Sequence, residues 1–421
     1  MLALMIGTMF LLLFLGFPMM IPLIGGALVV STTYFSFSPV NLVQQAFSGI
    51  APVALTAVPM FIFAADLMTR GEVADRLLNF VMSWVGHKRG GLPVATTAAC
   101  TLFGAVSGST QATVIAIGGP MRTRMLSAGY SDSFTTALVI NASEIALLIP
   151  PSIAMIVYGV VNGVSVGELF IAGVGPGVLI FAMFSAYCWY VSHNPNLEKA
   201  SLKDRLVATK KALLAFSFPV IIFGGIYSGK FSPTEAAAVS VLYALILEMF
   251  IYKSVKWSDL PKIAQSTGEV TAIVFILVAV GQSFSWVISF AQIPQMILPS
   301  VLGEAPSEIW VLCVITMAYF LGCMFVDPIV VIMVMSPIFK SAIVGIHPIF
   351  VGTLVTLQCA IGSGTPPFGC NIFTAMAVFK QRYVDTISGT LPFIILLLIA
   401  TILLIKFPII ALGLGQLAGM M

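Results

Sequence analysis

Two proline pairs, each inside a long apolar segment, constrain the fold of this chain more than any other feature. The pairs lie at 148–152, within the segment 134–160, and at 362–368, within 349–379. Proline has no backbone N–H and its ring clashes with the preceding turn, so a helix that carries two of them must break there. In a bilayer, the freed backbone groups need an ion, a ligand or protein atoms as partners. Interrupted helices in corresponding halves of a chain indicate the binding site of a transporter.

The composition requires a membrane environment. Hydrophobic residues make up 59% of the 421 residues and charged residues only 8%, whereas about a quarter of a soluble globular protein is charged. A helix needs about 20 apolar residues to cross the roughly 30 Å of a bilayer. The fold class expected is therefore an all-α polytopic membrane protein with nine crossings. The crossings expected are residues 1–30, 47–69, 134–160, 168–192, 213–228, 234–252, 270–292, 349–379 and 386–412.

Two further apolar segments are interrupted near their middle and are expected to form re-entrant hairpins. Hairpin one, about 92–125, contains a Gly- and Ser-rich stretch at 104–110, and hairpin two, about 308–340, contains Asp327 and Pro328. If both segments turn back, the basic linkers all fall on one side of the membrane, which is the positive-inside pattern. This predicts a cytoplasmic N-terminus and an external C-terminus. The basic linkers are residues 88–89, 122–124, 199–211, 253–262 and 380–382.

The two halves of the chain repeat. With a constant offset of 216, residues 129–176 align with 345–392 without gaps and share 11 of 48 residues, including both prolines of each pair. Apolar composition alone does not align a proline pair. We therefore expect a first repeat at 1–212, a linking helix at 213–228 and a second repeat at 229–421. Since the linking helix adds one crossing, the second repeat enters the membrane inverted, and both hairpin tips meet the broken helices near the midplane.

Six motifs spread over essentially the whole chain carry a family resemblance. They are residues 85–92, 104–113, 149–152, 229–238, 327–328 and 362–368. Together they resemble the large membrane subunit of the tripartite ATP-independent periplasmic (TRAP) transporters. The proline pairs and the sequence Pro-Thr-Glu-Ala-Ala-Ala at 233–238 are the most distinctive pieces.

The resemblance implies an elevator-type secondary transporter of the bacterial inner membrane, driven by sodium ions, and not an enzyme. In such a carrier, a domain that bears the hairpins slides against a scaffold, and the C-terminus expected outside is periplasmic. Two partners are also implied: a small four-helix membrane subunit, and a soluble periplasmic protein that binds an organic acid and delivers it. The extra helices of a fused small subunit are not found in this sequence, so that subunit is expected to be a separate protein.

Sodium sites are expected where the hairpin tips meet the breaks. Sodium binds several oxygen ligands, and inside a membrane these come from irregular backbone and from Ser or Thr hydroxyls. The alternative is that such hydroxyls only bond to preceding carbonyls or pack between helices. The ligands expected for a first sodium are Ser107, Gly108, Ser109, Ile149 and Pro150, and those for a second are Asp327, Gly362, Gly364 and Thr365.

The substrate site is expected to lack a cationic side chain. The hairpins and broken helices, at 92–121, 134–160, 308–339 and 349–379, contain Glu144, Glu308 and Asp327 as their only charged residues. A bound carboxylate must then be met by helix N-termini, hydroxyls and sodium, so that sodium coupling is a requirement of affinity. The residues expected to bind substrate are Ser107, Ser152, Asp327 and Thr365.

The two carboxylates at the breaks have different expected roles. An intramembrane carboxylate is functional by default, and Asp327 either ligates sodium or accepts hydrogen bonds from substrate hydroxyls; a structural role is the weaker alternative. Glu144 is expected one or two turns into its helix, where it could pair with Arg122 or Arg124, and a structural ion pair with one of them is the favoured interpretation.

The resemblance leans toward the sialic-acid branch of the family, so the expected substrate is sialic acid, N-acetylneuraminate, and a Ser-rich pocket with one Asp suits such a polyhydroxylated acid. A C4-dicarboxylate or another carboxylate is the alternative for the same kind of transporter. An ion or solute channel is a different class, disfavoured because hairpins from opposite faces close the midplane. An enzyme is the weakest interpretation, since the sequence contains no HExxH, no GxSxG and no paired catalytic Asp.

Overall fold

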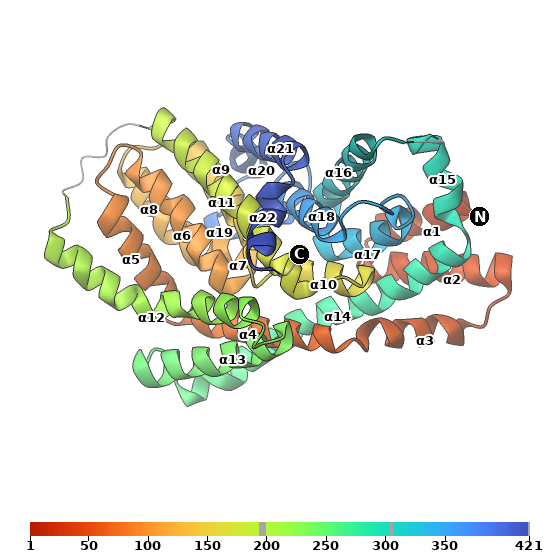
Figure 1. Ribbon diagram of the computed structural model, residues 1–421, viewed down its shortest axis with the longest axis horizontal. Coiled ribbons are helices and arrows are strands. Elements are labelled where there is room, and N and C mark those ends of the chain that lie inside the picture. The colour runs from red at the N-terminus through yellow and green to blue at the C-terminus, as the bar shows by residue number, and fades with distance from the viewer. Residues whose placement is uncertain (193–198, 304–305, 420–421) are drawn as a thin grey trace.

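The structure of the protein, a computed structural model, describes residues 1–192, 199–303 and 306–419, and that part of the chain is helical without a strand (Figure 1). Among these residues, six helical segments are long and apolar enough to cross a membrane, and one bent pair of helices can form a seventh span. The all-helical, multi-pass architecture expected from the sequence is confirmed. The six segments are Val53–Arg70, Val166–Val191, Leu202–Tyr227, Pro233–Ile251, Trp257–Phe290 and Glu308–Phe325.

Both expected broken helices are present. The first consists of α9 (Asp132–Ser143), the 3₁₀ turn η3 (Glu144–Leu147) and, after the first proline pair, α10 (Ile153–Asn162). The second consists of α18 (Pro348–Ser363) and, after the second proline pair, α19 (Cys370–Phe379). Both Pro-Pro peptide bonds are cis. The loss of amide donors at the prolines ends each first half-helix where the sequence predicts.

Hairpin one is a helical hairpin. Its first arm is α6 (Gly91–Ser107), and its return arm runs through the short α7 (Thr110–Thr113) and a π turn into α8 (Gly119–Ser127). The two arms contact each other far from the tip, since the Thr96 hydroxyl donates to the Met125 sulfur at 3.3 Å. The chain therefore turns back on itself, as predicted.

Hairpin two has the same design. It joins α16 (Glu308–Phe325) to α17 (Pro328–Phe339) through two residues, Val326 and Asp327. The hydroxyls of Tyr319 and Ser336 lie 3.1 Å apart, which brings the middles of the two arms together. Asp327 begins the return arm, because its carboxylate accepts the backbone N–H of Ile329 at 2.9 Å.

Each half of one broken helix packs on the opposite half of the other. The second half of the first, α10, packs on the first half of the second, α18: a Cβ added at Gly352 would lie 2.5 Å from the Tyr158 ring. The first half of the first, α9, packs on α19, where Val139 and Ala375 share an apolar cluster. This antiparallel crossing brings the two breaks face to face.

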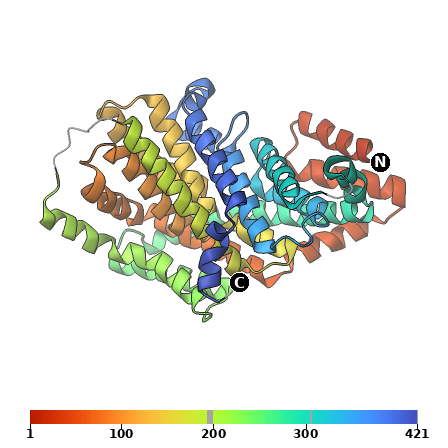
Figure 2. The ribbon, with the colours of Figure 1, turned by 45° about the horizontal axis from the view of Figure 1, so that its top comes forward.

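The remaining helices form an elongated frame around this core (Figures 1 and 2). The 31-residue α14 (Leu260–Phe290) packs along α3 (Pro39–Ile50), and α4 (Ala57–Arg70) packs on α13 (Pro233–Leu245). α13 begins with a capping box at 232–235, because the Ser232 side chain accepts the Glu235 N–H while the Glu235 carboxylate accepts the Ser232 N–H.

The first expected crossing, residues 1–30, is wrong as a single helix. The chain forms α1 (Leu2–Phe14) and α2 (Met20–Phe35), which pack on each other at one end of the molecule (Figure 2). Gly16, at φ +82°, and Pro18 interrupt the helix between them. The apolar composition of residues 1–30 did not reveal this break, because one long helix and two shorter helices joined by a turn have the same composition. The predicted orientation of the termini depended on the number of crossings and stays a prediction.

The boundaries of the expected linking helix, 213–228, are also wrong. α12 (Leu202–Tyr227) is 26 residues long and takes in most of the basic linker at 199–211. Ser201 begins the helix by accepting the Asp204 N–H at 3.1 Å. The Lys, Ala and Leu residues that follow are strong helix formers, and their charge does not end a helix that extends beyond the apolar region.

Two other expected crossings are interrupted at proline. The segment 47–69 divides at Pro52 into the end of α3 and the span that begins at Val53. The segment 386–412 forms α21 (Leu391–Lys406) and α22 (Ile409–Leu417), which bend by 57° next to Pro408. In each case the proline is compatible with a new helix start but not with continuation of the preceding one.

Candidate functional site

The tip of hairpin one touches the first break. Gly108 has φ +60°, and a Cβ placed there would lie 1.9 Å from the Pro151 carbonyl oxygen. Only glycine allows both the left-handed turn and this close approach. The next residue, Ser109, accepts the Ala112 N–H, and Ser152 on the other side of the contact accepts the Met155 N–H. The helices α7 and α10 therefore both begin at this contact.

The tip of hairpin two touches the second break. The Phe368 N–H donates to the Met324 carbonyl at 3.1 Å, and the Phe325 and Phe368 rings lie 5.7 Å apart. Asp327, two residues beyond Phe325, is only partly buried. The expectation that each hairpin tip meets one proline break is confirmed for both halves of the chain.

Glu144 connects the first broken helix to the second. Its carboxylate accepts the Ser363 hydroxyl at 2.6 Å and the Asn371 side-chain N–H at 2.7 Å, so it bonds to both ends of the second break. Glu144 is 1% exposed. A Cβ added at Gly364 would lie 3.0 Å from Glu144 Oε1, so the backbone of the break rests against the carboxylate.

The structure gathers further polar groups around Cys370, the first residue of α19. The Gln111 side chain, from the return arm of hairpin one, donates to the Cys370 sulfur at 3.5 Å. Asn371, the residue after Cys370, donates to Glu144, and Phe368, two residues before Cys370, donates to the Met324 carbonyl at the tip of the hairpin that carries Asp327. Elements of both hairpins and both broken helices thus converge on one region, which carries two carboxylates.

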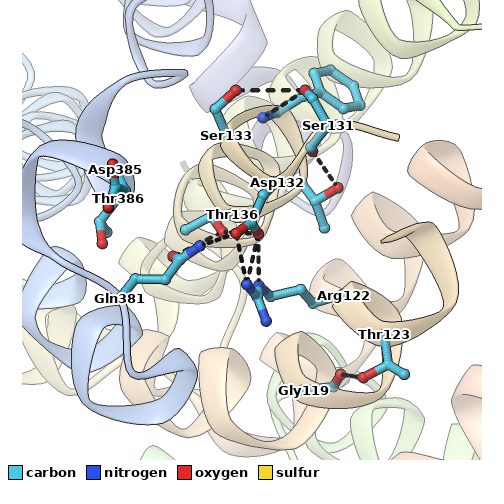
Figure 3. A network of polar contacts seen from close by, with 12 residues as sticks. Gly119, Arg122, Thr123, Ser131, Asp132, Ser133, Thr136, Gln381, Asp385 and Thr386 are labelled. Carbon is cyan, nitrogen blue, oxygen red and sulfur yellow. Dashed lines mark hydrogen bonds and ion pairs between the residues drawn. The ribbon is translucent and has the colours of Figure 1, made fainter. Parts of the chain in front are cut away.

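The expected ion pair of Glu144 with Arg122 or Arg124 is wrong. Arg122 instead donates through Nε and Nη2 to both carboxylate oxygens of Asp132, with a shortest distance of 2.7 Å, and Arg124 is exposed (Figure 3). Gln381 donates to the same Asp132 at 2.6 Å, and Thr136 donates to Gln381 (Figure 3). The expected partner is wrong because Glu144 begins η3, beyond the far end of α9, whereas Arg122 pairs with Asp132 at the start of α9.

The Arg122–Asp132 pair is expected to matter little for stability. The Asp132 side chain is 48% exposed, and exposed pairs contribute about 0–1 kcal/mol. We expect Asp132→Asn to lower the free energy of unfolding by less than about 1 kcal/mol, measured by chemical unfolding of the purified protein in detergent. Asp385→Asn, which removes the exposed pair with Arg382, is the matched control. A much larger loss in Asp132→Asn alone would contradict the expectation.

The hydroxyls expected at the first sodium site are engaged at the hairpin tip. Ser107 is buried and lies 3.3 Å from the Thr113 hydroxyl, and the Ser109 carbonyl accepts the Thr113 hydroxyl at 2.8 Å. Ile149 and Pro150 lie in the break beside this tip. The residues expected at this site are thus neighbours, and their role as sodium ligands stays a prediction.

At the second expected sodium site, the expected ligands make fewer contacts with one another than those at the first site. The Thr365 hydroxyl donates to the Ile361 carbonyl at 2.6 Å, as the structural alternative foresaw, and the Gly362 carbonyl accepts the Thr365 N–H. Gly364 lies beside Glu144. Asp327 approaches this break through hairpin two, and its role as an ion or substrate ligand stays a prediction.

Sequence reasoning missed four members of this region: Ser363, Asn371, Cys370 and Gln111. The signal available was their position, since three of them lie within five residues of a proline pair and the fourth follows the Gly-Ser tip. Their roles depend on contacts between residues more than 200 positions apart, such as Glu144 with Ser363, and periodicity does not reveal such contacts.

Comparisons with known proteins agree with this architecture. The family model described as "Tripartite ATP-independent periplasmic transporter, DctM component" matches residues 6–410. The ectoine TRAP transporter large permease protein TeaC of Halomonas elongata is 58% identical over 421 residues, covering 98% of this chain and 99% of that protein. The ectoine/5-hydroxyectoine TRAP transporter large permease protein UehC of Ruegeria pomeroyi is 58% identical over 418 residues, covering 98% of each.

Among solved structures, the YdaH transporter of Alcanivorax borkumensis superimposes with a TM-score of 0.64 at 12% identity, covering 87% of each chain. At this identity the similarity concerns the fold alone. The sialic-acid substrate expected from the sequence finds no support, since both relatives at 58% identity are named for ectoine.

The relatives are permease subunits, so the chain is part of a transporter and not an enzyme. Large permeases of this family work with a small membrane subunit and a periplasmic binding protein, and the apolar helices agree with a multi-pass protein of the inner membrane. A family match over residues 6–410 and relatives that share 58% of positions along nearly the whole chain show that the protein belongs to the DctM family, the large permease subunits of TRAP transporters.

Proposed function

We propose that the protein carries ectoine or 5-hydroxyectoine across the inner membrane, coupled to sodium, after a periplasmic binding protein delivers the substrate. The observation that carries the proposal is the charge of the core. Glu144 bonds to both ends of the second break, and the tip of the hairpin that carries Asp327 contacts the same break, while the hairpins and broken helices contain no Lys or Arg within 92–121, 134–160, 308–339 and 349–379. A negative field attracts a cationic group and repels a second carboxylate on the substrate.

Ectoine has the chemistry that such a field favours. It is a compact ring that carries an amidinium and one carboxylate, and is therefore a zwitterion. The names of the two relatives at 58% identity point to the same substrate class. A sialic acid or a dicarboxylate, which is an anion without a compensating cation, would depend entirely on sodium and helix N-termini for its charge.

Asp327 is the proposed partner of the amidinium. One of its carboxylate oxygens accepts the Ile329 N–H, and the side chain remains partly exposed, so it can receive a donor from the substrate. A carboxylate that accepts two N–H groups from a planar cation forms a strong charge-assisted pair. The substrate carboxylate would face the N-termini of α10 and α19. Ser107, Ser152 and Thr365 are buried, so they would contact substrate only in a closed site.

Sodium coupling is proposed at two places. The contact of Gly108 with the Pro151 carbonyl supports a first sodium held by Ser107, Gly108, Ser109, Ile149 and Pro150. The contact of Phe368 with the Met324 carbonyl supports a second sodium held by Asp327, Gly362, Gly364 and Thr365. Both places offer carbonyl and hydroxyl oxygens, which are the ligands that a hard monovalent cation requires.

The proposed movement is that of an elevator with two inverted repeats, one before and one after the linking helix α12 (Leu202–Tyr227). The antiparallel crossing of the broken helices supports inversion, because two copies in the same orientation would place α9 on α18 rather than on α19. The hairpins and broken helices would move together, while α3, α4, α13 and α14 form the scaffold.

Uptake into proteoliposomes tests the function. The protein is reconstituted with its small membrane subunit, the periplasmic binding protein is added outside, and uptake of labelled ectoine is followed with an inward sodium gradient. We expect uptake that requires both sodium and the binding protein and that excess unlabelled 5-hydroxyectoine suppresses. Uptake without the binding protein or without a sodium gradient would indicate a channel. Uptake of a C4-dicarboxylate but not of ectoine would overturn the proposed substrate.

A further inference from the structure

Glu144 is a buried carboxyl group without a cationic partner among the described residues. Among the residues that the structure describes, the ion pairs join other groups, and the contacts of the Glu144 carboxylate are neutral donors, Ser363 and Asn371. Removing a carboxylate from water costs several kcal/mol unless a counter-charge accompanies it. A carboxyl group that is 1% exposed and has no ion pair with a described residue therefore holds either a proton or a bound cation.

A second group beside Glu144 also lacks a partner. Asn371 is 0% exposed, and its Oδ1 accepts no hydrogen bond from the described part of the chain. The same amide places its nitrogen 2.7 Å from Glu144 Oε1, so its oxygen belongs to the immediate surroundings of the carboxylate. A buried carbonyl oxygen without a donor is unusual, and it is a natural ligand for a cation.

We propose that Glu144 and Asn371 form a cation site of their own, which binds a sodium ion between the two repeats. Each Glu144 oxygen accepts one hydrogen bond, and an ionised carboxylate has about four lone-pair sites, so both oxygens keep capacity for an ion. The site differs from the two proposed at the hairpin tips, since neither of its side chains is among their ligands. Its ion would connect η3, the end of the first half of the first broken helix, to α19 beyond the second break, and its binding would draw the two broken helices together.

The occupant is sodium and not the cationic end of the substrate. Glu144, Ser363 and Asn371 are all at or below 1% exposure, so the site is closed to a ligand of the size of ectoine in this structure. Sodium prefers carboxylate and carbonyl oxygens, and both are present here. The inference rests on the proposed sodium coupling, but it concerns a separate ion with separate ligands.

Equilibrium binding of ²²Na⁺ to the purified full-length protein with its small subunit tests this site. We expect Glu144→Gln to bind one sodium ion fewer per chain than the wild type. Gln keeps the shape and both hydrogen bonds, because its oxygen accepts the Ser363 hydroxyl and its nitrogen can donate to Asn371 Oδ1 once that amide turns over. If Glu144 is a neutral hydrogen-bonding partner, Glu144→Gln binds as many ions as the wild type with the same affinity, and the proposal is overturned.

A charge-swap variant provides the rescue. Glu144→Gln/Asn371→Asp moves the carboxylate to the other side of the same pair, and it is expected to regain the lost ion. If the double variant does not regain the ion, the site is contradicted. If Glu144→Gln folds poorly, the double variant is expected to fold better, and its failure to do so also contradicts the site. Absence of ectoine uptake by the wild type would overturn the proposed function without changing the ion count, so the two failures are distinguishable.

Discussion

Gly108→Ala is expected to reduce sodium-driven uptake by about 10- to 100-fold, the scale of loss that follows a displacement of about 1 Å at a reacting site. The added Cβ would lie 1.9 Å from the Pro151 carbonyl oxygen, and neither atom belongs to a flexible side chain. The hairpin tip must therefore withdraw from the first break. A carbonyl and the neighbouring hydroxyls then no longer converge on one ion. Initial rates of uptake at several sodium concentrations measure the effect, and we expect a raised half-saturating sodium concentration.

The matched control is Gly129→Ala. Gly129 also has a left-handed backbone, at φ +87°, but it is exposed and has no atom within 4 Å of an added Cβ. Both variants bear the same backbone strain, about 1–2 kcal/mol, and only Gly108→Ala bears the clash. Equal losses of uptake in the two variants would show that strain alone is responsible and would contradict the proposed contact.

Asp327→Asn is expected to raise the KM for ectoine by about 10- to 100-fold, since a hydrogen bond to a charged group contributes about 1.5–3 kcal/mol. Asn is as good as Asp at a helix N-cap, so it still accepts the Ile329 N–H and α17 still begins at Pro328. The substitution therefore removes the charge and retains the local structure. Uptake kinetics in proteoliposomes with the binding protein in excess provide the measurement.

The control for charge is Asp75→Asn, an exposed carboxylate in the first turn of α5 (Val73–Val85). It changes the net charge by the same amount away from the site, and uptake should stay at the wild-type rate. Near-normal uptake by Asp327→Asn would remove Asp327 from the site. A change in the half-saturating sodium concentration with an unchanged KM for ectoine would assign the carboxylate to sodium alone and remove its proposed contact with the substrate.

The proline pairs were the most informative local signal because their effect does not depend on context. A proline cannot donate at any position, so both broken helices could be predicted at their observed places. Isolated prolines were less informative. Pro18, Pro52 and Pro408 also interrupt expected crossings, whereas Pro176 lies inside the uninterrupted α11 (Val166–Val191). Packing of neighbouring helices decides whether a single proline ends a helix, and that packing is not visible in one segment.

The candidate site was predictable only in outline. The hairpin tips and breaks were expected to meet, and Gly108 with Pro151 and Met324 with Phe368 confirm it. The assignment of Glu144 failed because the choice among polar partners depends on which helices cross. Arg122 is closer along the chain, but α18 and α19 bring Ser363 and Asn371 into contact with Glu144.

The amino-acid sequence by itself determined the solvent of this protein, the helical class and the two places where backbone is left without helical partners. Each of these properties depends only on the residues of a single segment. Apolar side chains require a membrane, and proline, which has no N–H, breaks the helix in which it lies. Only the tertiary structure decided that α9 packs on α19 and α10 on α18, and hence that Glu144 spans the second break. Those pairings depend on shape and hydrogen-bonding complementarity between segments about 220 residues apart, such as Glu144 and Ser363, which no local pattern encodes.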